Sequence, residues 1–271
     1  MVKTKTAGNQ NEILFDAIYE KRSRFSRDYN PGIQWMCGLF RAALDNGEPA
    51  RVRSVLDIGC GDGVKTVFLK REMPHADVLG VDFSSVGIAA AESAYGGEGL
   101  SFRCLDAEDQ SLWEQRFDLI SAFEVLEHVD DWQGLLGKMC TNTNQYLLLS
   151  VPCGKLAPRE GELMGHVRRF RRGEIEDFLK SKGFSPLALY YAGFPFYNMG
   201  VNWYLRSTFL RKTHSEQIGS RQANWLSKMY YYLFTFLYQH ASTKRHFGMQ
   251  FVGLFEAERI RSTTNTDIVA E

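Results

Sequence analysis

Cysteine is scarce in this sequence, and no two cysteines stand close together. The five are Cys37, Cys60, Cys104, Cys140 and Cys153. Their odd number, their wide spacing and the lack of a CxxC pair argue against a disulfide framework and against a cysteine-based zinc site. Unpaired thiols persist in reducing compartments, so we expect a cytoplasmic protein.

Long apolar runs and an excess of charge are missing as well. The N-terminal stretch MVKTKTAGNQNE has no apolar core of a signal peptide, and nowhere does the sequence sustain the roughly 18 uncharged apolar residues that a membrane span needs. Lys plus Arg and Asp plus Glu number 32 each. With no overall field to attract a polyanion, the sequence predicts neither a spanning segment nor a nucleic-acid partner.

The sequence does have enough apolar residues for one full core and an elaboration. Of its 271 residues, 44% are hydrophobic and 24% are charged, which excludes a disordered or fibrous chain. Internal repeats are absent, but the texture changes along the chain. We divide it into an N-terminal helical cap, an α/β core, an aromatic helical insertion, and a closing strand with its tail, at residues 1–48, 49–193, 194–245 and 246–271.

Short apolar runs alternate with helical patterns along the core segment. The β-type runs, including one near the C-terminus, are Ser54–Ile58, Val78–Asp82, Leu100–Leu105, Phe117–Ala122, Tyr146–Val151 and Met249–Ala257, and the helical patterns lie near 64–72, 85–95, 130–140 and 173–182. This alternation predicts an α/β fold in which helices cover both faces of a parallel sheet. Before it, apolar residues at three-to-four spacing predict two amphipathic helices, separated near Asn30-Pro31-Gly32.

The first β-type run breaks into a glycine-rich turn. Residues 55–63 read VLDIGCGDG, and a GxGxG turn before a helix lets a ligand approach the backbone because side chains are absent there. Two later runs lead to acids, Asp82 and Asp106. A carboxylate at Asp82 can accept both hydroxyl hydrogens of a ribose, and Asp106 lies within reach of an adenine amino group. A dinucleotide site is disfavoured because Val64 stands where its fingerprint requires a third glycine.

These residues resemble the motifs of the class I S-adenosylmethionine-dependent methyltransferase family, from about Arg53 to Val151 and more loosely to the C-terminus. The resemblance implies a Rossmann-like, seven-stranded, mostly parallel sheet, with S-adenosylmethionine as cofactor and S-adenosylhomocysteine as product. It also implies the cofactor contacts: Asp57, Gly59 and Gly61 along the methionine part, Asp82 at the ribose, Phe83 on the adenine, Asp106 and Ala107 at the adenine edge, and Cys60 and Phe123 nearby.

A second group of polar residues follows the fourth β-type run. Glu124, Glu127 and His128 are spaced i, i+3 and i+4, so on a helical turn they would share one face toward the cleft. His166 follows the fifth run and is expected opposite them. Two carboxylates and two imidazoles suit a divalent ion such as Mg²⁺, Mn²⁺ or Zn²⁺.

The same four positions are similar to an ExxEH group and later histidine that bind metal in ubiquinone-biosynthesis O-methyltransferases and small-RNA 3′-end 2′-O-methyltransferases. A bound ion would lower the pKa of an acceptor hydroxyl. Without metal, His128 or His166 could act as general base or orient the acceptor. We therefore expect His128, His166 and Glu127 to be catalytic, and a purely structural role for them stays open.

The acceptor side is predicted from arginines and aromatic residues. Arginines after His166, with Arg168 and Arg169 first, could clamp a carboxylate or phosphate, or pair with Glu174 or Glu176 on a solvated loop. In the insertion, Phe196, Tyr197 and Trp203 begin an aromatic series that suits a hydrophobic or ring-containing acceptor. The same rings could instead pack the insertion onto the core, form a homodimer interface or, along the run at 225–238, lie against a membrane.

We predict transfer of a methyl group to a small molecule, most readily at oxygen. N- or C-methylation stays open, although the fourth run leads into Phe123-Glu124 where many base N-methyltransferases have an NPPY-type signature. Two alternatives remain: a non-catalytic cofactor-binding scaffold module, and a metal-dependent RNA 2′-O-methyltransferase, which the neutral charge disfavours.

Overall fold

A mixed sheet of seven strands forms the centre of the computed structural model, which describes residues 5–21, 30–156, 160–200, 229, 232–238 and 248–258. The strands are β1 Ser54–Ile58, β2 Asp77–Asp82, β3 Leu100–Cys104, β4 Phe117–Phe123, β5 Thr143–Pro152, β6 Phe184–Ala192 and β7 Gln250–Ala257. Their order across the sheet is β3-β2-β1-β4-β5-β7-β6, and β7 alone among them runs antiparallel to its neighbours. The expected Rossmann-like, mostly parallel sheet is confirmed.

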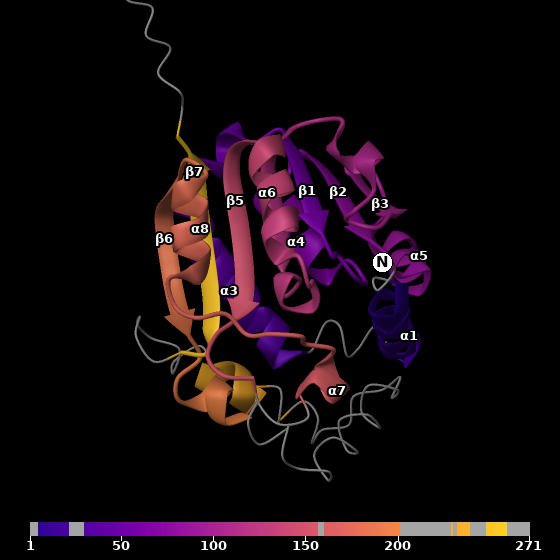
Figure 1. The fold of residues 1–271 in the computed structure, drawn as a ribbon, viewed down its shortest axis with the longest axis vertical. Helices are drawn as coiled ribbons and strands as arrows, with labels where there is room; N and C mark the ends of the chain where they lie inside the picture. Colours follow the sequence, from indigo (N-terminus) through magenta and orange to yellow (C-terminus); the bar gives the residue numbers. More distant parts are fainter. Residues whose placement is uncertain are drawn as a thin grey trace, which may run out of the picture.

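Helices cover both faces of this sheet (Figure 1). They are α1 Lys5–Lys21, α3 Pro31–Leu44, α4 Val64–Glu72, α5 Ser85–Tyr95, α6 Trp132–Asn142, α7 Glu160–Met164 and α8 Glu174–Ser181, with 3-10 turns η1 Pro49–Arg51, η2 Gln110–Trp113 and η3 Leu126–His128. Apolar side chains of α3, α4 and α5 form one buried cluster with the sheet, and those of α6 and α8 form another. The sheet is therefore buried on both sides, which explains its nearly continuous apolar strands.

The sequence patterns located these elements to within a few residues, except for β6, the short helix α7 and the 3-10 turns. Strand β6 at Phe184–Ala192 was not predicted, because Pro186 interrupts its apolar pattern. The strand tolerates the proline because it lies at the edge of the sheet, where its pairing with β7 shifts register between Pro186 and Ala188.

The two predicted N-terminal helices are present as α1 and α3. Helix α3 begins after Asn30, whose side chain accepts a hydrogen bond from the backbone N–H of Ile33 at 3.1 Å. Pro31 opens its first turn, where a missing N–H costs nothing. Figure 1 shows α1 and α7 at the end of the sheet toward which the parallel strands point, the edge at which such sheets bind ligands.

Part of the aromatic insertion packs on α3. Residues 196–200 and 232–238 are helical. The ring of Tyr197 lies 4.3 Å from that of Trp35 between centroids, and Tyr238 meets both rings at larger distances. These contacts fix the start and the end of the insertion to the core. Trp203 lies outside the described residues, and so do residues 225–228, 230 and 231 of the run at 225–238.

Within the parts of the chain that the structure describes, no helix combines the length and the apolar character needed to cross a bilayer.

Candidate active site

The glycine-rich turn leaves β1 at Ile58 and enters α4 at Val64. Gly59 and Gly61 both have positive φ, at 67° and 55°, which a residue with a side chain adopts only with strain. A Cβ on Gly59 would also lie 2.5 Å from the side chain of Val125. The turn is therefore held against the loop that follows β4, which carries the predicted acid and histidine group.

Asp82 closes this turn from the end of β2. Its two carboxylate oxygens accept the backbone N–H of Gly61 at 2.9 Å and that of Ser84 at 2.8 Å. Burial raises the pKa of Asp82, and the two N–H donors oppose this effect. Asp82 thus fixes the turn itself, in addition to the ribose role expected of it.

Asp57 points into the protein rather than along the turn. Its oxygens accept the hydroxyls of Thr66 at 2.7 Å and Ser121 at 2.8 Å, and the residue is 1% exposed. Burial raises its pKa to about 6, although both hydroxyls stabilise the charge. Its side chain therefore connects β1, α4 and β4 underneath the turn.

The expected adenine contacts lie near the end of β3. Phe83 is 36% exposed and presents an open ring face. Asp106 is exposed, and one of its oxygens accepts the N–H of Glu108 at 2.8 Å. The carbonyl of Ala107 accepts the indole N–H of Trp113 at 2.9 Å. Phe123 differs from the rest, because it is buried and stacked on Phe40 with ring centroids 4.0 Å apart.

A cavity of about 240 Å³ extends from the turn to Glu124 on the loop after β4. It is lined by Asn30, Gly32, Ile33, Met36, Cys60, Asp62, Val64, Lys65, Glu124 and Tyr197. Lys65 was not singled out from the sequence, yet its ammonium donates to the carbonyl of Phe123 at 2.7 Å. A lysine in the first turn of a helix is unfavourable because the helix dipole is positive at that end. This unusual placement is the sequence signal by which Lys65 could have been found.

Glu124 does not share a helical face with Glu127 and His128. It has φ 61°, and the turn that follows is the short 3-10 helix η3, which begins only at Leu126. One oxygen of Glu124 accepts from Ser150 at 2.8 Å and from Gln250 at 2.6 Å. The expected helical turn is therefore wrong, because the chain reverses at Glu124 and turns that carboxylate toward β5 and β7.

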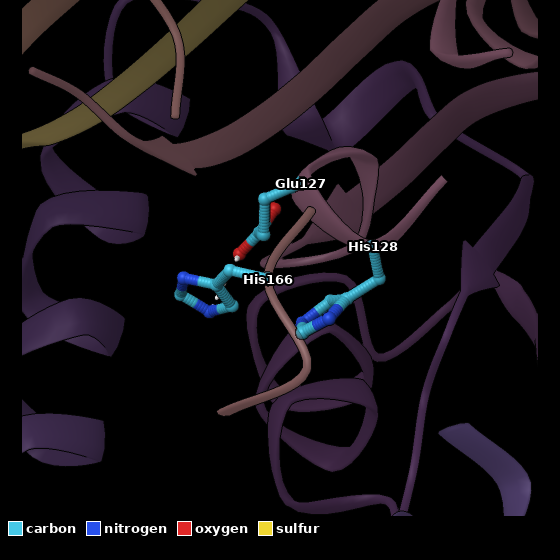
Figure 2. A group of neighbouring side chains, drawn as sticks. All are labelled: Glu127, His128 and His166. Atoms are coloured by element: carbon cyan, nitrogen blue, oxygen red, sulfur yellow. Dashed lines mark ion pairs between the residues drawn. The ribbon is translucent and has the colours of Figure 1, made fainter. Parts of the chain in front are cut away.

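Glu127, His128 and His166 do come together (Figure 2). One ligand atom from each lies within 4.8 Å of the others. Glu127 is fully buried, and neither of its carboxylate oxygens has a hydrogen-bond partner among the residues that the structure describes. The nearest cation-forming atom is Nε2 of His166, at 4.0 Å from Oε1.

The electrostatics of this cluster favour neutral forms. Burial, followed by the charge of Glu124, raises the pKa of Glu127 well above its ordinary range. Burial, followed by the charge of His166, lowers the pKa of His128 to about 4. A neutral His128 donates its Nδ1–H to the carbonyl of Gly165 at 3.0 Å, which leaves a lone pair on Nε2. A buried, unpaired carboxyl next to the neutral imidazole of His128 and a second histidine can bind a divalent ion or hold a proton.

The segment between β5 and α8 carries His166 to this position. Cys153 and Phe170 form an isolated parallel bridge at its two ends. Between them, the N–H of Val167 donates to the carbonyl of Glu127 at 2.9 Å. The backbone itself therefore holds His166 beside Glu127.

The predicted acceptor residues are spread over different environments. Arg168 pairs with Glu174 at 2.7 Å and lies over the rings of Trp132 and Phe170, and Arg169 pairs with Glu160 at 2.6 Å. The pairing of Arg168 agrees with the alternative in which these arginines bind acids of their own chain. Phe196 is 39% exposed, whereas Tyr197 lines the cavity.

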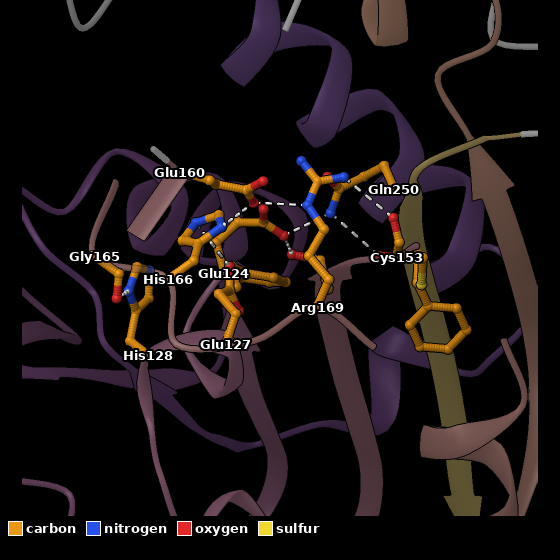
Figure 3. A network of polar contacts seen from close by, with 12 residues as sticks. Glu124, Glu127, His128, Cys153, Glu160, Gly165, His166, Arg169 and Gln250 are labelled. Carbon is orange, nitrogen blue, oxygen red and sulfur yellow. Dashed lines mark hydrogen bonds and ion pairs between the residues drawn. The ribbon is translucent and has the colours of Figure 1, made fainter. Parts of the chain in front are cut away.

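Besides Lys65, two contributors to the site were missed from the sequence. Glu160 is fully buried and accepts from both His166 and Arg169 (Figure 3), but it stands in a segment without periodicity. Helix α1 brings Tyr19 against Gly61 and Gly87. Both contacts join residues through tertiary structure, which no local pattern reveals.

Comparison with known proteins now identifies the family. The family described as "Methyltransferase domain" matches residues 26–189, more than half of the chain. The chain belongs to this family, and the strand order and glycine turn make it a class I, S-adenosylmethionine-dependent type, as the sequence motifs indicated.

More particular relatives are ubiquinone biosynthesis O-methyltransferases. That of Sinorhizobium fredii is 35% identical over 98 residues, which are 35% of this chain and 39% of the relative. The chain thus matches about two fifths of that relative's length.

Solved structures share the fold. Magnesium protoporphyrin IX methyltransferase from Synechocystis, solved with bound SAH, is 15% identical with a TM-score of 0.52 over 84% of each chain. Phosphoethanolamine N-methyltransferase 2 from Haemonchus contortus, in complex with S-adenosyl-L-methionine, is 16% identical with a TM-score of 0.55, over 82% of this chain and 53% of the other. At such identities the likeness concerns the fold alone.

Proposed function

We propose that this protein transfers the methyl group of S-adenosylmethionine to an oxygen of a small-molecule acceptor and releases S-adenosylhomocysteine. The observation that carries the proposal is the shared cavity, lined by Cys60 and Asp62 of the glycine turn on one side and by Glu124 of the acid loop on the other. The same loop carries Glu127 and His128, and the proposal places the methyl group of a donor held at the turn beside this loop.

The donor would lie along the ends of β1, β2 and β3. The turn from Gly59 to Gly61 is proposed to contact the methionine part, and Asp82 is proposed to bind the ribose. Phe83 supplies an open ring for the adenine, and Asp106 has oxygen lone pairs for its amino group. Holding donor and acceptor in line can lower the barrier by roughly 7–11 kcal/mol without further chemistry.

An oxygen acceptor suits the cluster because its imidazoles can accept a proton. His128 is neutral in the folded protein, and its Nε2 lone pair is not used by the Gly165 hydrogen bond. A hydroxyl placed between His128 and His166 would be oriented by a hydrogen bond to an imidazole, and the pKa of about 4 makes His128 a weak base for its proton as the methyl group is transferred. The relatives named as O-methyltransferases agree with this choice of atom.

A metal-assisted form of the same reaction is supported by Glu127. Its carboxylate is buried without a hydrogen-bond partner among the described residues, next to two imidazole nitrogens. One carboxylate and two imidazoles fit a divalent ion such as Zn²⁺ or Mn²⁺ better than Mg²⁺, and Glu127, His128 and His166 would hold it. Such an ion supplies Lewis acidity, which lowers the pKa of an acceptor hydroxyl. Glu124 would take part only if its bonds to Ser150 and Gln250 were broken.

The acceptor is proposed to be at least partly apolar. Exposed apolar side chains follow β6 and continue in the helical residues after 231: Phe194, Phe196, Met199, Tyr232, Leu233 and Phe236. Their exposure also suits a homodimer interface or contact with a membrane surface. We also propose that the protein is cytoplasmic. The division of the chain into four segments, which end at residues 48, 193, 245 and 271, is part of the same proposal.

The test is transfer of a labelled methyl group from S-adenosylmethionine into fractionated small molecules, with parallel arms containing Mg²⁺ or chelator. A labelled product, identified by mass, supports the enzyme and reveals its acceptor. Loss of label in the chelator arm supports the metal, and retention of label contradicts it. Donor binding by calorimetry without label in any fraction would favour a non-catalytic cofactor-binding module instead.

A further inference from the structure

Glu160 is the first residue of α7 and is fully buried. Its Oε1 atom accepts from Nδ1 of His166 at 2.6 Å and from Nε of Arg169 at 2.6 Å. Figure 3 shows the carboxylate between the imidazole and the guanidinium. None of these contacts involves the glycine turn or the cavity, so Glu160 is connected to the site through His166.

We propose that Glu160 is a positioning residue that fixes the orientation and tautomer of His166; this inference rests on the proposed methyl transfer at the Glu127 cluster. A carboxylate can only accept, so the bond requires a hydrogen on Nδ1 of His166. In the neutral ring, the lone pair must then lie on Nε2. That atom is the one that faces Glu127, at 4.0 Å from its Oε1.

Arg169 stabilises Glu160 as a carboxylate, which can only accept hydrogen bonds. A buried carboxylate is costly unless it is paired and hydrogen-bonded, and Arg169, whose side chain is 3% exposed, supplies both the charge and the N–H. The same guanidinium donates to the carbonyl of Cys153 at 3.2 Å, which ties it to the end of β5. The position of Glu160 is thus determined from the sheet rather than from His166.

Different acceptors favour the same Nδ1–H tautomer in the two histidines of the cluster. The carbonyl of Gly165 accepts from Nδ1 of His128, and the carboxylate of Glu160 accepts from Nδ1 of His166. In their neutral forms both imidazoles would therefore carry the lone pair on Nε2, and the two rings lie with their centroids 4.8 Å apart. That is the arrangement needed by a metal ligand or by a general base, and partners of this kind typically orient such imidazoles.

The backbone around Glu160 does not depend on its side chain. The N–H of Gly165 donates to the carbonyl of Gly161 at 2.9 Å, and Val167 is bonded to Glu127 at 2.9 Å. Removing the carboxylate should therefore free the imidazole of His166 while the segment stays in place. A merely structural role would instead loosen the whole segment.

The experiment compares Glu160→Gln, which keeps an oxygen acceptor, with Glu160→Leu in the full-length protein. Glu176→Gln is the matched control, because that carboxylate accepts from Tyr191 away from the cluster. We expect Glu160→Leu to lower kcat roughly 10- to 100-fold with little change in the KM for S-adenosylmethionine, and Glu160→Gln to recover most of the loss.

The second readout is the ¹⁵N NMR spectrum of the imidazoles, assigned with His166→Gln, and it requires no acceptor. We expect His166 to be the Nδ1–H tautomer in the native protein and in Glu160→Gln, and a mixture in Glu160→Leu. An unchanged tautomer in Glu160→Leu would overturn the proposal, even if methyl transfer itself were established. If the leucine variant does not fold, Glu160→Asp tests the same point by shortening the acceptor while it keeps the charge.

Discussion

The ring of Phe15 meets the imidazole of His128 edge to face, with ring centroids 5.2 Å apart. Phe15 also meets Phe83 edge to face at 6.0 Å, and the hydroxyl of Ser84 donates to the carboxylate of Asp16. Helix α1 thus contacts both the expected adenine position and the histidine cluster. A single helix near the N-terminus therefore links donor binding to the chemistry of the acceptor side.

The contacts of Phe15 on α1 are expected to slow the release of S-adenosylmethionine. Phe15→Leu keeps an apolar side chain but removes both edge-to-face contacts, which are worth about 0.5–1.5 kcal/mol beyond their buried area. We expect the dissociation rate of S-adenosylmethionine, measured by stopped-flow fluorescence, to rise roughly 2- to 10-fold. Ile13→Ala, at a position that is 65% exposed on the same helix, is the control. Equal rates in both variants would show that α1 does not retain the donor.

Replacing Asp82 with a neutral side chain of the same size should weaken the binding of S-adenosylmethionine. In Asp82→Asn the amide has one acceptor oxygen, so it cannot serve both Gly61 and Ser84 as well as the ribose. Hydrogen bonds to a charged acceptor contribute about 1.5–3 kcal/mol, so we expect roughly a 10- to 100-fold weaker Kd by calorimetry. The control is Asp77→Asn, exposed at the opposite end of the same strand. Near-native affinity for Asp82→Asn would contradict the assignment of the donor site.

Replacing Glu127 should preserve the stability of the protein but abolish its binding of a metal ion. Because its buried carboxyl has no hydrogen-bond partner among the described residues, Glu127→Gln should leave the Tm in chelator unchanged or higher. Added Mg²⁺ or Mn²⁺ should raise the Tm of the native protein and not that of the variant. Differential scanning fluorimetry measures both. An equal rise in both proteins would remove Glu127 from the proposed ligands, and no rise in the native protein would remove the metal.

The pKa of Asp57 predicts how stability changes with pH in the absence of donor. Its ordinary value is 3.8 and burial raises it to about 6, so between these values the folded protein holds a proton that the unfolded chain has released. Raising the pH from 4 to 6 therefore lowers the free energy of unfolding, by about 2 kcal/mol for this residue. At about one pH unit above the folded pKa, Asp57 is ionised in both states and the effect becomes constant.

Asp57→Asn removes this titration and should flatten the decline. The measurement is the difference in free energy of unfolding between native protein and variant, from urea denaturation at several pH values. We expect that difference to change by about 2 kcal/mol between pH 4 and pH 6.5. Asp130→Asn, at an exposed position, should show no such change. A pH-independent difference for Asp57→Asn would mean that the Thr66 and Ser121 hydroxyls fully offset burial.

Much of this fold follows from local sequence patterns. The alternation of apolar runs and helical spacings located β1 to β5 and β7, because strands buried on both faces are apolar along their whole length. Strand β6 escaped because an edge strand with Pro186 lacks that pattern. The turn and Asp82 were evident from the sequence because glycines and a strand-terminal acid carry a requirement that few other residues satisfy.

The acid and histidine cluster could be predicted only in part. Spacing brought Glu127 and His128 together correctly, but it also placed Glu124 with them, and the left-handed backbone at Glu124 has no sequence signature when the residue is not glycine. The contacts of Glu160 with His166 and of Phe15 with His128 depend on how loops and α1 pack. Such long-range pairs are fixed by tertiary structure, and a single sequence does not contain them in readable form.

The bridge between Cys153 and Phe170 has a consequence for protein engineering. The chain leaves the sheet and returns to it at two adjacent points, so residues 154–169 form an excursion with a closed neck. Because loop closure depends only weakly on loop length, a segment of different length could be grafted at this neck without moving β5 or α8. Such chimeras would exchange the histidine-bearing wall of the site as one unit, while the donor end of the sheet stays the same.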